Sequence, residues 1–224
     1  MFRKSLAKLK YTLNVYKIKS AVLRKVWIKS RGIIPNCYDE KKAIFVHIPK
    51  VAGRSVAGGI FGNEKPGHYY SKDYKIASAA KHKNYYKFTF VREPLDRLHS
   101  SYNYLIAGGG NAVDEYFGAI LVKETKSFED FVLNWLDETK IESWIHLVPQ
   151  SRYIYLVDGT CGVDFIGKFE NINADFSLLT RTLKLDLEIA HSNRSLLQKN
   201  INYSPLVIRK VRHLYKQDYI NFGY

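Results

Sequence analysis

The sequence has 224 residues, of which 46% are hydrophobic and 25% are charged, a composition typical of one globular domain with or without an appendage. This excludes a disordered chain, a collagen and a disulfide scaffold, and the two cysteines, Cys37 and Cys161, fit a reducing compartment or indifference to redox. The 35 basic and 21 acidic residues give a net charge of +14, so the question is where this charge lies.

The N-terminal segment carries most of the excess charge. Residues 1–38 contain ten basic residues and no acidic one, which leaves a net charge of only +4 on the other 186 residues. Apolar residues recur in this segment at spacings of three and four, namely Leu6, Leu9, Leu13 and Tyr16. This spacing predicts an amphipathic helix over 2–29, which Pro35 would end. We therefore separate a basic helical extension, 1–38, from a domain over 39–224.

A basic amphipathic helix is suited to an anionic membrane surface, which residues 1–31 would contact. The alternative, equally open from the sequence, is that its apolar face packs on the rest of the protein. No apolar run approaches the length of about 20 residues that spans a bilayer, and none follows the charged start as in a signal peptide.

The first motif with chemical content follows an apolar run at 43–48, which predicts a buried strand leading through a small-residue turn into a helix at 55–62. Such a turn presents backbone N–H groups to an anion, and the helix dipole adds to the attraction. Lys50 would add a point charge and Ser55 a hydroxyl donor. The pattern is not a Walker A loop, because Lys50 comes before the glycine and no Gly-Lys-Ser/Thr occurs. An ordinary strand–helix turn is the alternative.

The second motif follows an aromatic, alternating stretch at 86–91, which predicts a strand that ends at Arg92 and continues into a helix at 94–106. Arg92 would then lie at the carboxyl end of a strand, where open α/β sheets bind ligands. Together with Ser100 it could hold a phosphate through a bidentate fork. The alternative is pairing with neighbouring carboxylates, which we expect for Arg97 rather than for Arg92.

The remaining elements complete an α/β fold. Further strands are predicted at 152–158 and 163–168, and further helices at 71–81, 127–138, 173–184 and 204–220, with Ser127 as an N-cap. Alternation of this kind predicts a P-loop-like parallel sheet flanked by helices. The glycines at 108–110 predict a flexible loop that could act as a lid over an acceptor.

With these motifs in place, the sequence resembles the sulfotransferases that use 3′-phosphoadenosine 5′-phosphosulfate (PAPS), in their carbohydrate-modifying branch. The resemblance covers about 43–224 and rests on five stretches in order: 47–55, 92–102, 149–150, 164–171 and 218–224. The sequence departs from the family pattern at Val51 and Arg54, where hydroxyl residues are usual, and at Glu93, where Asn or Asp is usual.

The resemblance assigns roles to the two anionic motifs. It implies that the 5′-phosphosulfate of PAPS is cradled by Lys50, Gly53, Arg54 and Ser55. It implies that the 3′-phosphate is held by Arg92 and Ser100, with Arg194 contacting the 3′-phosphate or the adenine. Lys50 would also stabilise the bridging oxygen of the leaving group, and no metal is expected, because a transferring sulfuryl group carries less negative charge than a phosphoryl group.

Transfer to a hydroxyl requires a base, for which histidine is the usual choice. His68 resembles the base region of the uronyl 2-O-sulfotransferases and is the predicted general base. His47 is expected to be a packed residue beside the loop and His146 to face the acceptor. The histidines expected on solvated surfaces are His82, His99 and His213. Trp135 and Trp144 are candidates for stacking on sugar rings, with core packing as the alternative.

Two other functions compete with sulfuryl transfer. Residues 154–159 resemble a Walker B strand with Asp158 available for Mg²⁺, which would fit a nucleotide-dependent kinase, or a plain turn at this position. The second is a basic nucleic-acid-binding protein, which the local nature of the charge disfavours. We expect a saccharide or glycolipid acceptor and no nucleic acid. Because animal Golgi members carry a membrane-spanning anchor and none is seen here, we expect a bacterial, cytoplasmic enzyme, with peripheral attachment to the inner face of the membrane as an option.

Overall fold

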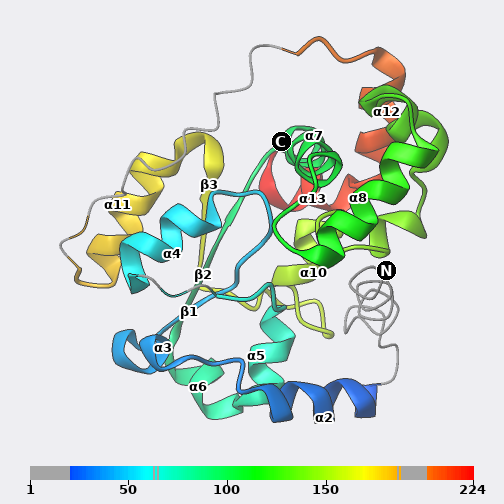
Figure 1. The fold of residues 1–224 in the computed structure, drawn as a ribbon. Helices are drawn as coiled ribbons and strands as arrows, with labels where there is room; N and C mark the ends of the chain where they lie inside the picture. The colour runs from blue at the N-terminus through cyan, green and yellow to red at the C-terminus, as the bar shows by residue number, and fades with distance from the viewer. Residues whose placement is uncertain (1–20, 63, 65, 186, 188–200) are drawn as a thin grey trace. The chain divides into compact units, whose positions relative to one another are not determined.

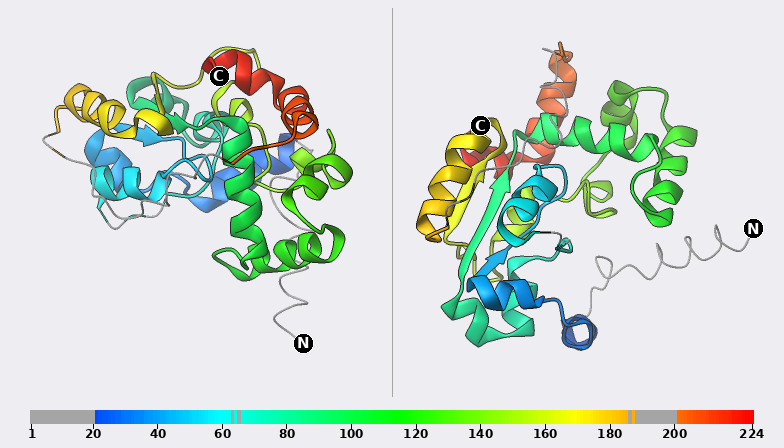
Figure 2. Two further views of the ribbon diagram at one scale, coloured as in Figure 1. Left: turned by 90° about the horizontal axis from the view of Figure 1, so that it is seen from above. Right: turned by 60° about the vertical axis from the view of Figure 1, so that its left-hand side comes forward.

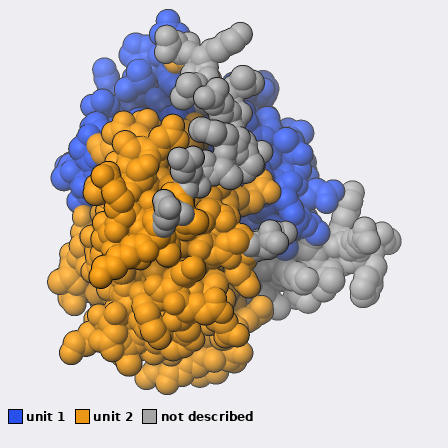
Figure 3. Space-filling view, turned by 90° about the vertical axis from the view of Figure 1, so that its left-hand side faces the viewer, with its two compact units in different colours: residues 1–24, 93–149, 202–224 blue, residues 25–92, 150–201 orange. Residues whose placement is uncertain are grey.

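The computed structural model describes residues 21–62, 64, 66–185, 187 and 201–224. The chain divides into two compact units (Figure 3). Unit 1 comprises 1–24, 93–149 and 202–224, and unit 2 comprises 25–92 and 150–201. The boundary that we place at residue 38 stays a prediction.

Unit 2 contains a parallel sheet of three strands in the order β1 (Ala43–Phe45), β2 (Tyr86–Val91) and β3 (Phe165–Lys168) (Figure 1). Phe88 in the central strand pairs with both Phe45 and Phe165. The strands form because they are rich in aromatic and branched residues, most of which are buried, and the rings of Phe45 and Phe88 stack with centroids 5.1 Å apart. The parallel α/β sheet predicted from the sequence is confirmed. The strand predicted at 86–91 has the observed bounds, and those predicted at 43–48 and 163–168 are present but shorter.

The other elements of unit 2 are α3 (Asn36–Lys41), α4 (Gly53–Phe61), α5 (Ser71–Ala77), α6 (Ala79–Asn84), α10 (Gln150–Ile154), the 3-10 turn η4 (Phe169–Asn171) and α11 (Ile172–Thr182). Figures 1 and 2 show α4 and α11 side by side. They approach closely because Gly59 has no side chain, where a Cβ atom would lie 2.7 Å from the ring of Phe176. The helix predicted over 71–81 is two helices, because Ser78 is extended and its side chain caps α6.

The helix α2 (Ala21–Arg31) covers the last part of the helix predicted over 2–29. Residues 1–20 lie outside the described residues, so the rest of that helix stays a prediction. In the part of the chain that the structure describes, no helix combines the length and apolar character needed to cross a membrane.

The strand predicted over 152–158 is wrong. Its first residues belong to α10, and the chain then turns back so that Tyr155 forms an isolated antiparallel bridge with Cys161. Asp158 lies in the exposed turn, where its Oδ1 accepts hydrogen bonds from the backbone N–H and the hydroxyl of Thr160. The prediction failed because the apolar residues do not share a buried strand. Tyr153 and Ile154 are buried on the helix α10, while Val157 is 93% exposed. The Walker B resemblance therefore fails.

Unit 1 is helical in its described part. Its elements are α7 (Pro94–Ile106), α8 (Ala112–Glu124), α9 (Phe128–Asp130), the π-helical turn η2 (Phe131–Trp135), the 3-10 turn η3 (Lys140–Glu142), α12 (Pro205–Leu214) and α13 (Lys216–Phe222). Their apolar faces share one core, to which α7 contributes Leu98, α8 contributes Phe117 and α12 contributes Val211. Ser127 caps α9 as predicted, since its hydroxyl accepts from the N–H of Asp130 at 3.1 Å. The sequence analysis missed α8, although Asn111 is a clear N-cap, with its side chain accepting from the first turn.

The structure also bears on other expectations for unit 1. Arg97, expected in surface ion pairs, is fully buried and donates to the carbonyl oxygens of His146 and Val148 at 3.2 and 2.8 Å. For Trp135 and Trp144 the core alternative is confirmed, and their indole N–H groups donate to carboxylates of the same unit. The N–H groups of Gly108 and Gly109 donate to carbonyls of α7 and close its end, and the role of this loop as a lid stays a prediction.

Candidate functional site

The loop between β1 and α4 has an unusual backbone conformation. Lys50 and Ala52 both take positive φ, at 70° and 60°, a region that residues with a Cβ atom rarely adopt. Backbone strain of this kind in a non-glycine residue points to a functional constraint. Alternation of left- and right-handed residues turns successive N–H groups inward, the geometry of an anion-binding nest.

The first residue of α4 must be a glycine. A Cβ atom on Gly53 would lie 1.9 Å from Nε2 of His47, so the imidazole packs directly on the glycine backbone. His47 is buried, as expected for a packed residue, and its ring lies 4.2 Å from that of His68, measured between centroids. The loop, the start of α4 and the two histidines therefore form one contiguous group in unit 2.

Backbone acceptors orient both imidazoles. Nδ1 of His68 lies 2.9 Å from the carbonyl oxygen of His47, and Nδ1 of His47 lies 2.9 Å from that of Pro66. A carbonyl oxygen only accepts, so each Nδ1 carries the proton and each basic lone pair is on Nε2. Burial lowers the pKa of His68, against the opposing effect of its hydrogen bond, and burial lowers that of His47 further. Both rings are therefore neutral at pH 7.

Arg92 lies at the carboxyl end of β2, as predicted, and is buried. Its Nη1 donates to the carbonyl oxygen of Lys50 at 3.4 Å, and its guanidinium lies 4.3 Å above the ring of Phe169. Its backbone is fixed by Gln150, whose side chain accepts from the Arg92 N–H at 2.9 Å and donates to the Arg92 carbonyl at 2.8 Å. This places a second cation directly against the strained loop.

Six of the predicted site residues lie in unit 2: Lys50, Gly53, Arg54, Ser55, His68 and Arg92. Ser100 lies on α7, in unit 1, and Arg194 lies outside the described residues. The sequence analysis did not assign roles to Gln150 and Phe169. Their only signal was that both fall in stretches that resemble the family.

The other histidines do not join this group. His146 is buried in unit 1, with Nδ1 at 3.7 Å from Asp114, and does not face open solvent. His82, expected on the surface, is buried, and its Nε2 lies 2.9 Å from the hydroxyl of Ser71. That hydroxyl donates to the carbonyl of Gly162, so His82 must be the donor and the pair is no nucleophile–base dyad. Burial lowers the pKa of His82 to about 4.

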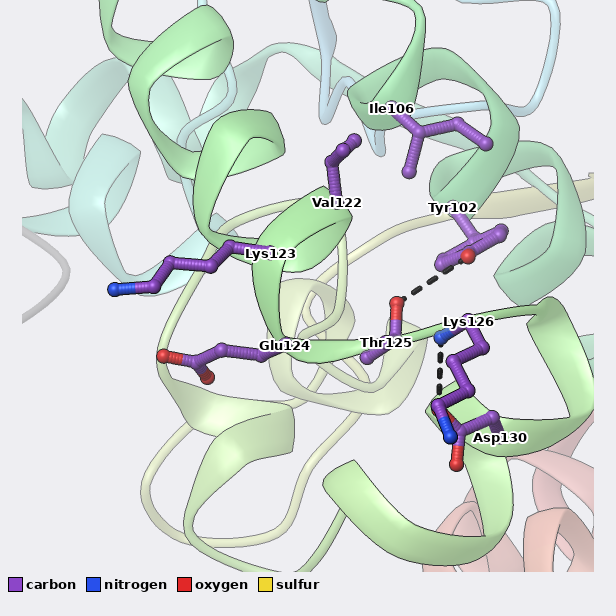
Figure 4. A pocket seen from close by; sticks show the side chains of 8 residues that line it. All are labelled: Tyr102, Ile106, Val122, Lys123, Glu124, Thr125, Lys126 and Asp130. Atoms are coloured by element: carbon purple, nitrogen blue, oxygen red, sulfur yellow. Dashed lines mark hydrogen bonds between the residues drawn. The ribbon is translucent and has the colours of Figure 1, made fainter.

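Unit 1 also carries a pocket of about 590 Å³ beside α7 and α8 (Figure 4). It is lined by Tyr102, Ile106, Val122, Lys123, Glu124, Thr125, Lys126 and Asp130. Its polar groups bond one another, as the hydroxyls of Tyr102 and Thr125 do at 3.3 Å and the Lys126 N–H and Asp130 do at 2.8 Å. None of the predicted site residues lines it.

Comparison with known proteins connects this geometry to a family. Neither the curated proteins nor the solved structures that were searched include a match to the chain. The family model described as "Sulfotransferase family" (Sulfotransfer_2) matches residues 36–224, which include both strand ends, the strained loop and the histidine pair. The chain belongs to the sulfotransferase family and is a sulfotransferase.

Proposed function

We propose that this enzyme moves a sulfuryl group from PAPS to a hydroxyl of a carbohydrate or glycolipid acceptor. The observation that carries the proposal is the strained loop at Lys50 and Ala52, with buried Arg92 held against it. A nest of backbone N–H groups at the start of a nine-residue helix is suited to a phosphosulfate. An adjacent guanidinium is suited to a phosphate.

The donor is divided between the two motifs. Lys50, Gly53, Arg54 and Ser55 cradle the 5′-phosphosulfate, and exposed Arg54 supplies a guanidinium where the family usually has a hydroxyl. Arg92 binds the 3′-phosphate, and the family resemblance alone also assigns Ser100 and Arg194 to this end of the donor. The segment 47–55 contains no acidic residue, so its cations meet an anion without competition from a carboxylate of the same loop.

His68 acts as the base in this proposal. Nε2 of neutral His68 takes the proton of the acceptor hydroxyl, the acceptor oxygen forms its bond to sulfur, and the bond between sulfur and the bridging oxygen breaks. Adenosine 3′,5′-bisphosphate leaves, and the Lys50 ammonium stabilises the charge that develops on its phosphate oxygen. No metal takes part, because the lysine replaces a metal clamp.

The competing functions lose their support. A nucleotide-dependent kinase needs a carboxylate for Mg²⁺ at the end of a strand, and Asp158 lies in an exposed turn bonded to Thr160. Nothing in the described residues favours nucleic acid binding over an anionic donor. The saccharide acceptor, the bacterial source and the cytoplasmic location rest on the resemblance alone and are part of the same proposal.

The base role is tested by comparing His68→Ala with His213→Ala, a matched exposed histidine on α12. Transfer of label from PAPS should fall about 10²–10⁴-fold in His68→Ala, while calorimetric binding of adenosine 3′,5′-bisphosphate stays at the wild-type level. His213→Ala should behave as wild type in both assays. Retained turnover in His68→Ala, or loss of nucleotide binding, would reject the role.

A further inference from the structure

The helix α2 has apolar residues on two sides. On one side Ile28 is fully buried, and the ring of Trp27 lies 6.2 Å from that of Tyr69. On the other side Val22, Leu23 and Val26 are 71%, 62% and 62% exposed. The sequence left open whether this helical segment contacts a membrane surface or packs on the rest of the protein. The two are not exclusive for α2, because it packs through one side and exposes a second apolar side.

The exposed side is compact and bordered by cations. Val22 and Val26 are one helical turn apart and so share a face, which Leu23 widens. Lys25 and Lys29, also one turn apart, are exposed on the same helix. We call these five residues the α2 face. Elsewhere in the described residues the exposed large apolar side chains are spread over several elements, as Val157, Leu206 and Ile220 show.

We propose that the α2 face docks on an anionic lipid surface. An apolar strip with flanking lysines inserts into the boundary of the acyl chains while its ammonium groups contact lipid phosphates and carboxylates. The surrounding sequence favours this occupant, because residues 1–38 carry ten basic residues and no acidic one. The same charge disfavours a second copy of the chain, since two such segments repel one another. A soluble polyanion is also disfavoured as the partner, because it would contact the lysines but would not cover the three exposed apolar side chains.

This inference does not depend on the proposed transfer reaction, and its test needs no substrate. The full-length protein is mixed with vesicles of phosphatidylcholine, with or without phosphatidylserine, and the bound fraction is measured by sedimentation. We expect binding to the anionic vesicles only, weakened by added salt. The variant V22S/L23S/V26S and the variant K25E/K29E should each bind at least about tenfold more weakly.

Matched control variants separate the effect of the α2 face from that of the protein's net charge and of its other exposed apolar residues. V157S/L206S/I220S removes three exposed apolar side chains elsewhere, and K83E/K216E makes the same change in net charge on exposed lysines. Both controls should keep at least half of the wild-type binding, and circular dichroism should show that all four variants remain folded. Equal binding to neutral vesicles, undiminished binding by either α2 variant, or binding to heparin without binding to vesicles would overturn the proposal.

Discussion

His47 and His68 each donate their Nδ1 proton to a backbone carbonyl, and one of these carbonyls belongs to His47 itself. The side chain of His47 bonds to the carbonyl of Pro66, and the backbone carbonyl of His47 orients the ring of His68, two residues after Pro66. His68 is therefore held in one tautomer by the backbone and not by a carboxylate. This leaves its proton affinity to be set mainly by burial.

The pH dependence of transfer follows from this arrangement. A protonated His68 has no lone pair on Nε2, so kcat should fall as the pH is lowered through its pKa. Because burial lowers that pKa, the acidic limb should be centred below 6.5, the usual value for histidine. The profile is measured with saturating PAPS, and His213→Ala should show the same limb. An acidic limb centred above 6.5 would contradict the assignment.

Two glycines of the same helix give a second prediction. Gly53→Ala places a methyl group 1.9 Å from Nε2 of His47 and should reduce the free energy of unfolding by about 1–3 kcal/mol, with weaker binding of adenosine 3′,5′-bisphosphate. Gly58→Ala is the matched control, since its Cβ atom meets nothing within 4 Å, and it should stabilise by about 0.5–1 kcal/mol. Urea unfolding and calorimetry measure the two effects. Equal stability and affinity in the two variants would show that the Gly53 contact is unimportant.

At the scale of elements, the strand–loop–helix unit of β1 and α4 was predictable, because the apolar run is followed by a turn of small residues and then by residues that can start a helix. The left-handed conformation of Lys50 and Ala52 was not, since neither residue type favours it. The hydrogen bonds between the Gln150 side chain and the backbone of Arg92 join residues 58 positions apart, so no local sequence pattern predicts them. The run around Ile154 was misread because short apolar stretches suit a buried strand and a helix equally.

The misread segment gives a prediction of its own. Asp158→Ala removes two hydrogen bonds of an exposed turn and should cost about 1 kcal/mol of stability at most. It should leave sulfuryl transfer and nucleotide binding unchanged. The measurement is the rate of transfer beside a thermal melt. A large loss of activity with an intact fold would reinstate Asp158 as a functional carboxylate.

At the scale of the whole molecule, the net charge of +14 separates into two parts, to which we assign different proposed roles. Ten basic residues belong to 1–38, and four of them lie on α2 beside its exposed apolar side. The proposed site needs only a few placed cations, of which Lys50 and Arg92 lie in unit 2. The division of the domain into two units could not be predicted, because each unit is assembled from segments far apart in the sequence.

The central claim is that this sulfotransferase uses PAPS without a metal. The most direct measurement is the incubation of the full-length protein with PAPS labelled in the sulfuryl group, in the presence of EDTA, with a panel of oligosaccharides, lipid-linked glycans and phenols. We predict a labelled saccharide or glycolipid product, formed together with adenosine 3′,5′-bisphosphate. The absence of any labelled product, combined with no binding of PAPS, would contradict the account.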